Sequence, residues 1–272
     1  MLRPLKPIPV RRLFPVVVIG YMGNNIYPFR AGEVLRAYVL RRREQVPMSG
    51  SLATVIVERV FDGLVMLIFV FAALPLAPLP SSEIQTLVVF ASLAFFGALI
   101  VFFIMAAQPH RFMRLSRWFS DRLLPPRIGT PLLGFLERFL DGLAALRNFR
   151  QVLMIFFTSI LIWLLETVKY WFVMHAFDFE VSFFALMLMN GVVNLATTLP
   201  SAPGYVGTFD GPGIAVLVLY GIPQSIAAAY TLVLHAALWL PITLLGGYYM
   251  LREGLGWRDF ERAVKQGDKV KN

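Results

Sequence analysis

Six charged residues at short spacings are the strongest chemical signal in this otherwise apolar sequence. Three of them follow one another at intervals of three residues, and three more lie within one turn and a half of a later apolar segment. Residues three apart share one face of a helix, and charges inside apolar segments should face one another or a wet cavity. We therefore predict one cluster of three arginines and three acids. Its members are Arg30, Glu33, Arg36, Glu58, Arg59 and Asp62.

This cluster has two interpretations that the sequence leaves open. Guanidinium groups bind phosphate oxygens with two hydrogen bonds at once, so the arginines are suited to hold a lipid phosphate while the acids hold the arginines in place. A balanced set of charges is also able to satisfy itself internally. In that case the cluster is a structural brace between two segments.

Two stretches rich in helix-breaking residues lie inside apolar sequence. The later one reads LPSAPGYVGTFD from Leu199 to Asp210, and its prolines and glycines favour a turn. We expect a helix to begin around Thr208 to Gly211 and to be capped by Thr208 or Asp210. An anion site formed by its N–H groups inside the membrane is the alternative. The residues predicted to form the two turns are Asn24, Asn25, Pro28, Pro200, Pro203, Gly204, Gly207, Thr208 and Asp210.

A few further titratable residues lie in apolar segments. Glu166 and Lys169 are three residues apart, so we expect them to pair, either as a structural ion pair or for proton coupling. His175 and His235 are expected to be isolated near helix ends. No metal ligand set and no catalytic residue is predicted from them.

The composition is that of a membrane protein. Of 272 residues, 58% are hydrophobic and 15% charged, and the mean hydropathy is +0.69, whereas soluble domains are nearer 25% charged. We predict an all-α fold, a polytopic integral membrane helical bundle, because lipid offers no partners to open backbone groups. The absence of cysteine excludes disulfides and thiolate metal sites. The net charge of +9 fits the positive-inside rule, so no nucleic-acid partner is expected.

The apolar pattern predicts one transmembrane domain over residues 1–251 and a basic cytoplasmic tail over 252–272. A basic loop over 107–151, with an interfacial amphipathic helix, is expected on the cytoplasmic side. Four segments are long enough to span a bilayer. They are residues 52–74, 84–106, 152–177 and 224–250.

Counting membrane sides from the basic flanks leaves two regions that must return to the side from which they enter. Residues 13–40 are predicted to form a re-entrant hairpin from the cytoplasm, because each arm is too short to span. Residues 181–220 are predicted to form a second hairpin from the opposite face, with two full spans as the alternative. Such layouts occur in transporters. Both termini are then cytoplasmic, and the expected location is the cell membrane.

Three motifs carry a family resemblance. They are N-x-x-P-x-R-x-G-E-x-x-R from Asn25 to Arg36, E-R-x-x-D from Glu58 to Asp62, and L-P-x-x-P-G-x-x-G-T-F-D, which ends at Asp210. In this order they resemble the flippase-like transmembrane region of lysylphosphatidylglycerol synthases and its stand-alone, mostly uncharacterised relatives. The resemblance implies movement of a charged lipid between leaflets, and some relatives are linked to isoprenoid-carrier glycolipids or glycosyltransferases.

The chain departs from this family pattern in two places. Relatives usually carry two more spanning helices before the first motif, so the chain is expected to be short at its N-terminus. The acid near position 210 is usually Glu in relatives and is Asp210 here. The charge is retained and its reach is shorter.

Three functions compete at this point. The first is lipid translocation with a phospholipid or isoprenoid-phosphate headgroup in the cluster. The second is a non-catalytic membrane subunit that supports a glycosyltransferase or lipid-modifying enzyme. The third, an embedded lipid-carrier enzyme, is disfavoured because the sequence has no evident nucleophile motif and no histidine in the cluster. We expect membrane lipids as partners, no cofactor and no enzymatic activity of the chain itself.

Overall fold

The computed structural model describes residues 6–27, 30–77, 109–123, 149–199 and 202–255, with single positions between 89 and 133. Throughout these ranges the secondary structure is helical and contains no strand, which confirms the predicted all-α class. The chain divides into two units, one made of residues 1–80 with 163–272 and the other of residues 81–162. The predictions for Pro28, Pro200, most of 84–106 and the tail beyond 255 lie outside the described residues.

The described helices fall in both units. The larger unit holds α1 (Val10–Ile26), α2 (Ala31–Glu44), α3 (Met48–Leu76), the second half of α7 (Phe149–Met174), α8 (Phe183–Ala196), the short 3₁₀ helix η1 (Pro203–Tyr205), α9 (Asp210–Leu219) and α10 (Gln224–Arg252). The smaller unit holds α5 (Pro109–Leu123) and the first half of α7.

Two of the described helices are long and apolar enough to cross a membrane. They are Val152–Met174 of α7 and Gln224–Arg252 of α10, and both coincide with predicted spans. α3 has 29 residues, or about 43 Å at 1.5 Å per residue, but it carries Glu58, Arg59 and Asp62 in its first half. These helices fit a membrane protein, whereas the number of passes and the side of each terminus stay predictions.

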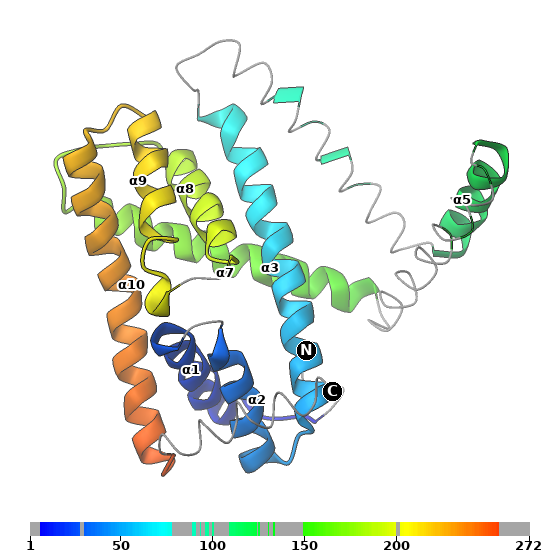
Figure 1. Cartoon of the computed structure of the whole chain (residues 1–272), viewed down its shortest axis with the longest axis horizontal. Coiled ribbons are helices and arrows are strands. Elements are labelled where there is room, and N and C mark those ends of the chain that lie inside the picture. The colour runs from blue at the N-terminus through cyan, green and yellow to red at the C-terminus, as the bar shows by residue number, and fades with distance from the viewer. Residues whose placement is uncertain are drawn as a thin grey trace. The chain divides into compact units, whose positions relative to one another are not determined.

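Two pairs of short helices lie between α10 and α3 in the larger unit, α1 with α2 and α8 with α9 (Figure 1). Their lengths are 17, 14, 14 and 10 residues, about 15 to 25 Å, which is shorter than the ~30 Å core of a bilayer. In the view of Figure 1, α8 and α9 occupy the upper part of this unit and α1 and α2 the lower part. Both predicted hairpin regions are thus helix–break–helix structures, and their re-entry from opposite membrane faces stays a prediction.

The first pair packs backbone against backbone. An added Cβ on Gly32 would collide with the carbonyl oxygen of Gly20 and the amide of Asn24, and one on Gly23 would lie 2.7 Å from Gly32 Cα. The small residues therefore set how closely α1 and α2 approach. Below them, buried Ile19, Leu35 and other apolar side chains fill the interface.

The second pair packs through side chains. An added Cβ on Gly213 of α9 would lie 2.8 Å from Met189 Cε of α8 and 2.9 Å from Thr231 Cγ2 of α10. The break between the two helices uses Gly204, Tyr205 and Gly207, with φ of +70°, +61° and +84°. Glycine adopts such left-handed conformations readily, which explains its use here.

α5 confirms a helix inside the basic segment 107–151. Trp118 and Phe119 are about half exposed, and the Arg122 guanidinium lies 5.2 Å from the centre of the Trp118 ring. Arg114 is exposed on the same helix. The location of α5 at a membrane interface stays a prediction.

Candidate functional site

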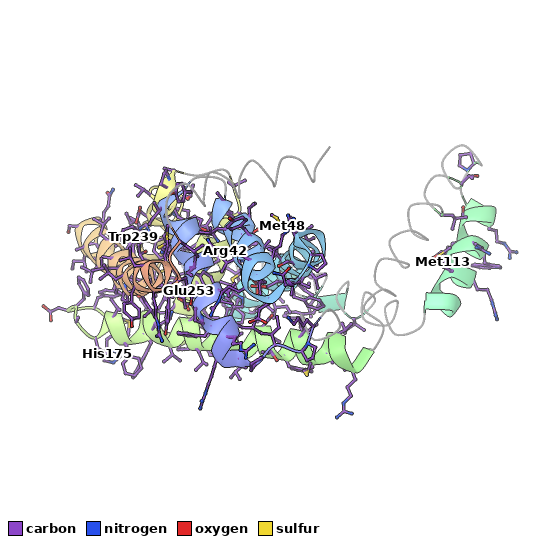
Figure 2. All side chains as sticks on the ribbon, turned by 90° about the horizontal axis from the view of Figure 1, so that it is seen from below. Arg42, Met48, Met113, His175, Trp239 and Glu253 are labelled. Atoms are coloured by element: carbon purple, nitrogen blue, oxygen red, sulfur yellow. The ribbon has the colours of Figure 1, made fainter. Side chains whose placement is uncertain are left out.

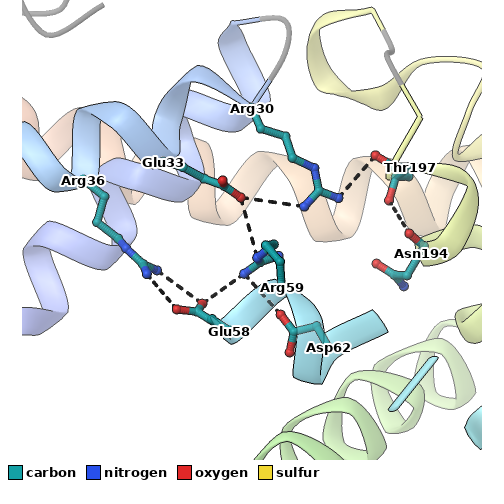
Figure 3. Close-up of polar contacts among 8 residues, drawn as sticks. All are labelled: Arg30, Glu33, Arg36, Glu58, Arg59, Asp62, Asn194 and Thr197. Carbon is teal, nitrogen blue, oxygen red and sulfur yellow. Dashed lines mark hydrogen bonds and ion pairs between the residues drawn. The ribbon is translucent and has the colours of Figure 1, made fainter. Parts of the chain in front are cut away.

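The structure brings all six predicted charged residues into one ion-pair network between α2 and α3 (Figure 3). Three positive and three negative side chains balance one another. Their side chains are between 14% and 30% exposed, so the network is largely buried. A neutral set is the arrangement expected of charges in an apolar bundle.

Arg36 and Glu58 form the tightest pair of the network. Two guanidinium nitrogens of Arg36 donate to the two carboxylate oxygens of Glu58, at 3.3 and 2.6 Å. This fork-to-fork geometry is the strong, directional form of an ion pair. It fixes α2 to α3 at one level.

Arg59 is the centre of the network. Its guanidinium lies 2.9 Å from Glu58, 3.2 Å from Asp62 and 3.6 Å from Glu33, measured between nitrogen and oxygen. Asp62 is held from its other side, because the indole nitrogen of Trp163 donates to it at 3.0 Å. One arginine on α3 therefore holds two acids of its own helix and one acid of α2.

Arg30 has the longest contacts of the six. It immediately precedes α2 in a left-handed conformation, φ +53°, which turns its side chain toward the other helix pair. One nitrogen lies 3.7 Å from Glu33, and another donates to the carbonyl oxygen of Thr197 at 3.3 Å. Arg30 thus links the charge network to the end of α8 (Figure 3).

A small cleft opens beside the network, with room for about one water molecule. Its lining includes Tyr21, Asn24, Glu33 and Arg59. Three buried polar atoms of this lining make no hydrogen bond within the described part of the chain. They are Asn24 Oδ1, Glu33 Oε1 and Arg59 Nε, and the last two form an ion pair at 3.6 Å that is too long for a hydrogen bond. The cleft therefore lies beside the loosest contacts of the network.

A second polar row extends from Asp62 along α7 and α8. The side-chain amide of Asn190, itself fully buried, donates to Thr167 Oγ1 at 2.9 Å and to the carbonyl oxygen of Trp163 at 3.3 Å. Asn194 donates to Asn190 at 2.6 Å. These groups satisfy one another, so they position α7 and α8 rather than offer open ligand positions.

The two breaks meet at the middle of α10. The side-chain amide of Asn25 donates to Thr243 Oγ1 at 2.8 Å, and the Trp239 indole donates to the Asn25 carbonyl oxygen at 3.3 Å. An added Cβ on Gly204 would lie 3.0 Å from that indole nitrogen and 3.4 Å from Asn25 O. Trp239, labelled in Figure 2, is therefore a shared support for both breaks.

The prediction that His235 is isolated is wrong. It lies well inside α10, and its Nδ1 is 2.7 Å from Asp210 Oδ1 while its Nε2 is 2.7 Å from Gly204 O. The spacing of 25 residues between the acid and the histidine gave no local signal. Only the return of the chain after the break, through α9 to α10, brings them together.

The expected capping of α9 is also wrong. The helix begins at Asp210, and no side chain accepts a hydrogen bond at its N-cap, Phe209. Thr208 donates to Tyr205 O, and Asp210 Oδ2 accepts from the Gly207 amide. Asp210 thus ties the preceding loop and His235, and its carboxyl group lies where the sequence suggested an anion.

The remaining predictions concern α7 and metals. Glu166 and Lys169 form an ion pair along α7, and a coupling role for them stays a prediction. Among the described residues, no group of three His, Cys, Asp or Glu side chains is placed to hold a metal ion. His175 Nδ1 donates to the Trp171 carbonyl oxygen at 2.8 Å, at the exposed end of α7 (Figure 2).

Comparison with known proteins agrees with the three motifs. A family model described as "Lysylphosphatidylglycerol synthase TM region" matches residues 1–246. A protein described as a UPF0104 membrane protein in Methanocaldococcus jannaschii is 24% identical over 249 residues, which are 89% of this chain and 74% of that protein. Another UPF0104 membrane protein, from Methanothermobacter thermautotrophicus, is 26% identical over 90% of this chain and 75% of its own length.

One relative has a more specific name. Glycosyltransferase AglD of Haloferax volcanii is 26% identical over 262 residues, which cover 85% of this chain and 41% of that protein. No solved structure matches the chain significantly.

Proposed function

Because the chain belongs to the family of the lysylphosphatidylglycerol synthase transmembrane region, we propose that it is a lipid-translocating membrane protein. Its six-residue charge network binds the phosphate of an anionic phospholipid or isoprenoid-phosphate headgroup. The observation that carries this proposal is the contact of the network with both helix pairs, because Arg30 at the start of α2 donates to the Thr197 carbonyl oxygen at the end of α8 at 3.3 Å (Figure 3). A site there is accessible from either side as one pair or the other moves.

The geometry of the network suggests how a headgroup enters. An anion must displace a carboxylate, and the longest ion pairs are those of Glu33 with Arg30 and Arg59, at 3.7 and 3.6 Å. Release of Glu33 leaves two guanidinium groups for a phosphate. The bidentate pair of Arg36 with Glu58 stays as the frame.

Translocation further requires a multi-pass arrangement in the cell membrane. We propose cytoplasmic termini and re-entry of the two helix pairs from opposite faces, since basic residues flank the first pair and the end of α10. The sequence contains no phosphate-binding loop of a nucleotide hydrolase. An ion gradient, a partner or the lipid gradient itself then supplies the energy.

A second candidate function is supported by one relative. The match to a protein named glycosyltransferase covers 41% of that protein, so the shared region is a part of a larger chain there. The present chain is then a non-catalytic membrane subunit, which supports a glycosyltransferase or lipid-modifying enzyme. Its charge network is a brace, as the balanced charges allow.

The first test is lipid binding by the purified protein. Arg30→Gln removes the arginine with the longest contacts, and Arg11→Gln changes an exposed arginine of α1 as a matched control. We expect mass spectrometry to find co-purified anionic lipid with the natural sequence and with Arg11→Gln, and a several-fold loss with Arg30→Gln. Identical lipid profiles in all three would favour the brace.

The second test is movement of the lipid. The protein is reconstituted into vesicles with a labelled anionic lipid in one leaflet, with and without a proton gradient. We expect labelled lipid to appear in the other leaflet faster than with Arg30→Gln. Binding without movement under either condition would reject translocation, and co-purification of a glycosyltransferase with the chain would support the second candidate.

A further inference from the structure

The hydrogen bonds of His235 determine where its protons must be. A carbonyl oxygen only accepts hydrogen bonds, so the 2.7 Å contact with Gly204 O requires a proton on Nε2. The other ring nitrogen, Nδ1, lies 2.7 Å from Asp210 Oδ1. With Nε2 protonated, a neutral histidine has only a lone pair at Nδ1.

A neutral histidine beside a carboxylate would therefore place two acceptors face to face at this distance. The contact is a hydrogen bond only when one more proton lies between the two groups, either on the imidazolium or on the carboxyl group. The pair then has no net charge, which suits side chains that are each 14% exposed. We propose that His235 and Asp210 form a proton-binding site, and that the bound proton holds the break before α9 against α10.

The pair is built into that break. Asp210 Oδ2 accepts from the Gly207 amide at 2.9 Å, and the Phe209 ring stacks on the imidazole with 4.5 Å between centroids. Loss of the proton leaves a net negative charge in an apolar bundle and a single ring proton for two acceptors, so either the Nδ1–Oδ1 contact or the Nε2–Gly204 O contact becomes repulsive. The closed break is thus favoured at low pH, and it opens as pH rises.

Other titratable groups lie on the elements packed around the pair, and the charges of Arg30, Arg59 and Glu33 act on the hydroxyl group of Tyr205 in the break. Asp210 is the single titratable side chain that a hydrogen bond or ion pair joins to His235 among the described residues. α8, which packs on α9, carries none. Those of α1, η1 and α10, the elements packed nearby, are Arg11, Arg12, Tyr21, Tyr205, Tyr230, Tyr248, Tyr249 and Arg252.

This proposal goes beyond lipid translocation and is tested without lipid transport. The chain has no cysteine, so two introduced cysteines carry spin labels at chosen positions. Val206→Cys lies in the break and Leu244→Cys on α10, both about two-thirds exposed. The distance between the labels is measured by pulsed electron spin resonance in nanodiscs from about pH 5 to about pH 9, a range that contains the protonation change expected of histidines in general.

We expect one short distance at low pH and a second, longer population that grows as pH rises. Asp210→Asn offers His235 a neutral partner that needs no extra proton, so its short distance should persist at every pH. His235→Gln should also give a distribution that does not change with pH. His175→Gln, at the exposed end of α7, is the matched control and should keep the response of the natural sequence. A constant distance in the natural sequence, or a pH response that survives both Asp210→Asn and His235→Gln, would overturn the proposal.

Discussion

The two pairs of short helices differ in how their helices pack and in the charged residues near their breaks. α1 and α2 approach through glycine backbone, and Arg30 at their break belongs to a network of three arginines and three acids. α8 and α9 approach through side chains, and their break carries a single acid, Asp210, held by one histidine. Both breaks rest on Trp239 of α10.

The first pair depends on the permanent charge of arginine, whereas the second depends on a histidine. Arginine keeps its charge at any physiological pH, so the positive charges of the network do not depend on pH. The second pair instead has the ion pair of Asp210 and His235, whose hydrogen bond needs a proton in the proposal above. The first pair is therefore the one for which we propose an anion site, and the second is the one for which we propose a response to pH.

The largest effect should follow from Gly32→Ala in the first pair. The new methyl group would collide with backbone atoms of Gly20 and Asn24, which move only if the helices separate. We expect a loss of about 3 kcal/mol in the free energy of unfolding, at the upper end for overpacking. Chemical denaturation in detergent micelles measures it.

Gly63→Ala on α3 is the matched control for this change. A Cβ there meets nothing within 4 Å, and alanine favours helix by about 0.5–1 kcal/mol over glycine. The control should be neutral or slightly more stable. Equal stability of Gly32→Ala and Gly63→Ala would mean that the two helices do not approach through their backbones.

Arg59→Gln should have the second-largest effect. It leaves Glu58, Asp62 and Glu33 with one arginine fewer, and uncompensated buried charges cost about 3–5 kcal/mol. The side chains are up to 30% exposed, so screening reduces our expectation to about 2 kcal/mol. Denaturation of this variant beside Arg11→Gln, which should stay within about 0.5 kcal/mol of the natural sequence, checks it. A loss no larger than that of Arg11→Gln would show that the network does not stabilise the fold.

Gly213→Ala tests the second pair in the same way as Gly32→Ala tests the first. Its Cβ would meet the ends of the Met189 and Thr231 side chains, which are able to shift. We expect a loss of about 1 kcal/mol, at the low end for overpacking. Gly211→Ala on the same helix, where a Cβ meets nothing within 4 Å, is its control. If Gly213→Ala costs as much as Gly32→Ala, the contrast between backbone and side-chain packing is wrong.

The predictable part of the fold comes from local patterns. The arms of both breaks, about 13–25 and 31–40 in the first, became α1 and α2 because glycines, prolines and apolar runs determine where helices begin and end. Arg30, Glu33 and Arg36 could be grouped because their spacing places them on one helix face. Burial in an apolar chain then required partners, and the nearest balanced set was on the next helix.

The unpredicted part depends on distant segments. His235 and Asp210 are 25 residues apart, and Asn25 and Thr243 are 218 apart. No periodicity joins such positions, because their contact depends on how α9, α1 and α10 pack. For the same reason, the sequence could not show that Asp210 serves the loop and His235 instead of capping its own helix.

The smallest effect should follow from Asn25→Ala, which tests whether the first break is coupled to α10. The change removes the 2.8 Å hydrogen bond to Thr243 Oγ1, and a neutral hydrogen bond contributes about 1 kcal/mol. Thr243→Val removes the partner hydroxyl with little change of shape, and the double variant completes a cycle. We expect the sum of the two single losses in the free energy of unfolding to exceed the loss of the double variant by about 0.5–1 kcal/mol, the coupling typical of residues in contact. Fully additive losses would mean that Asn25 does not join the first break to α10. The two helix pairs would then share the support of Trp239 without an energetic link through this amide.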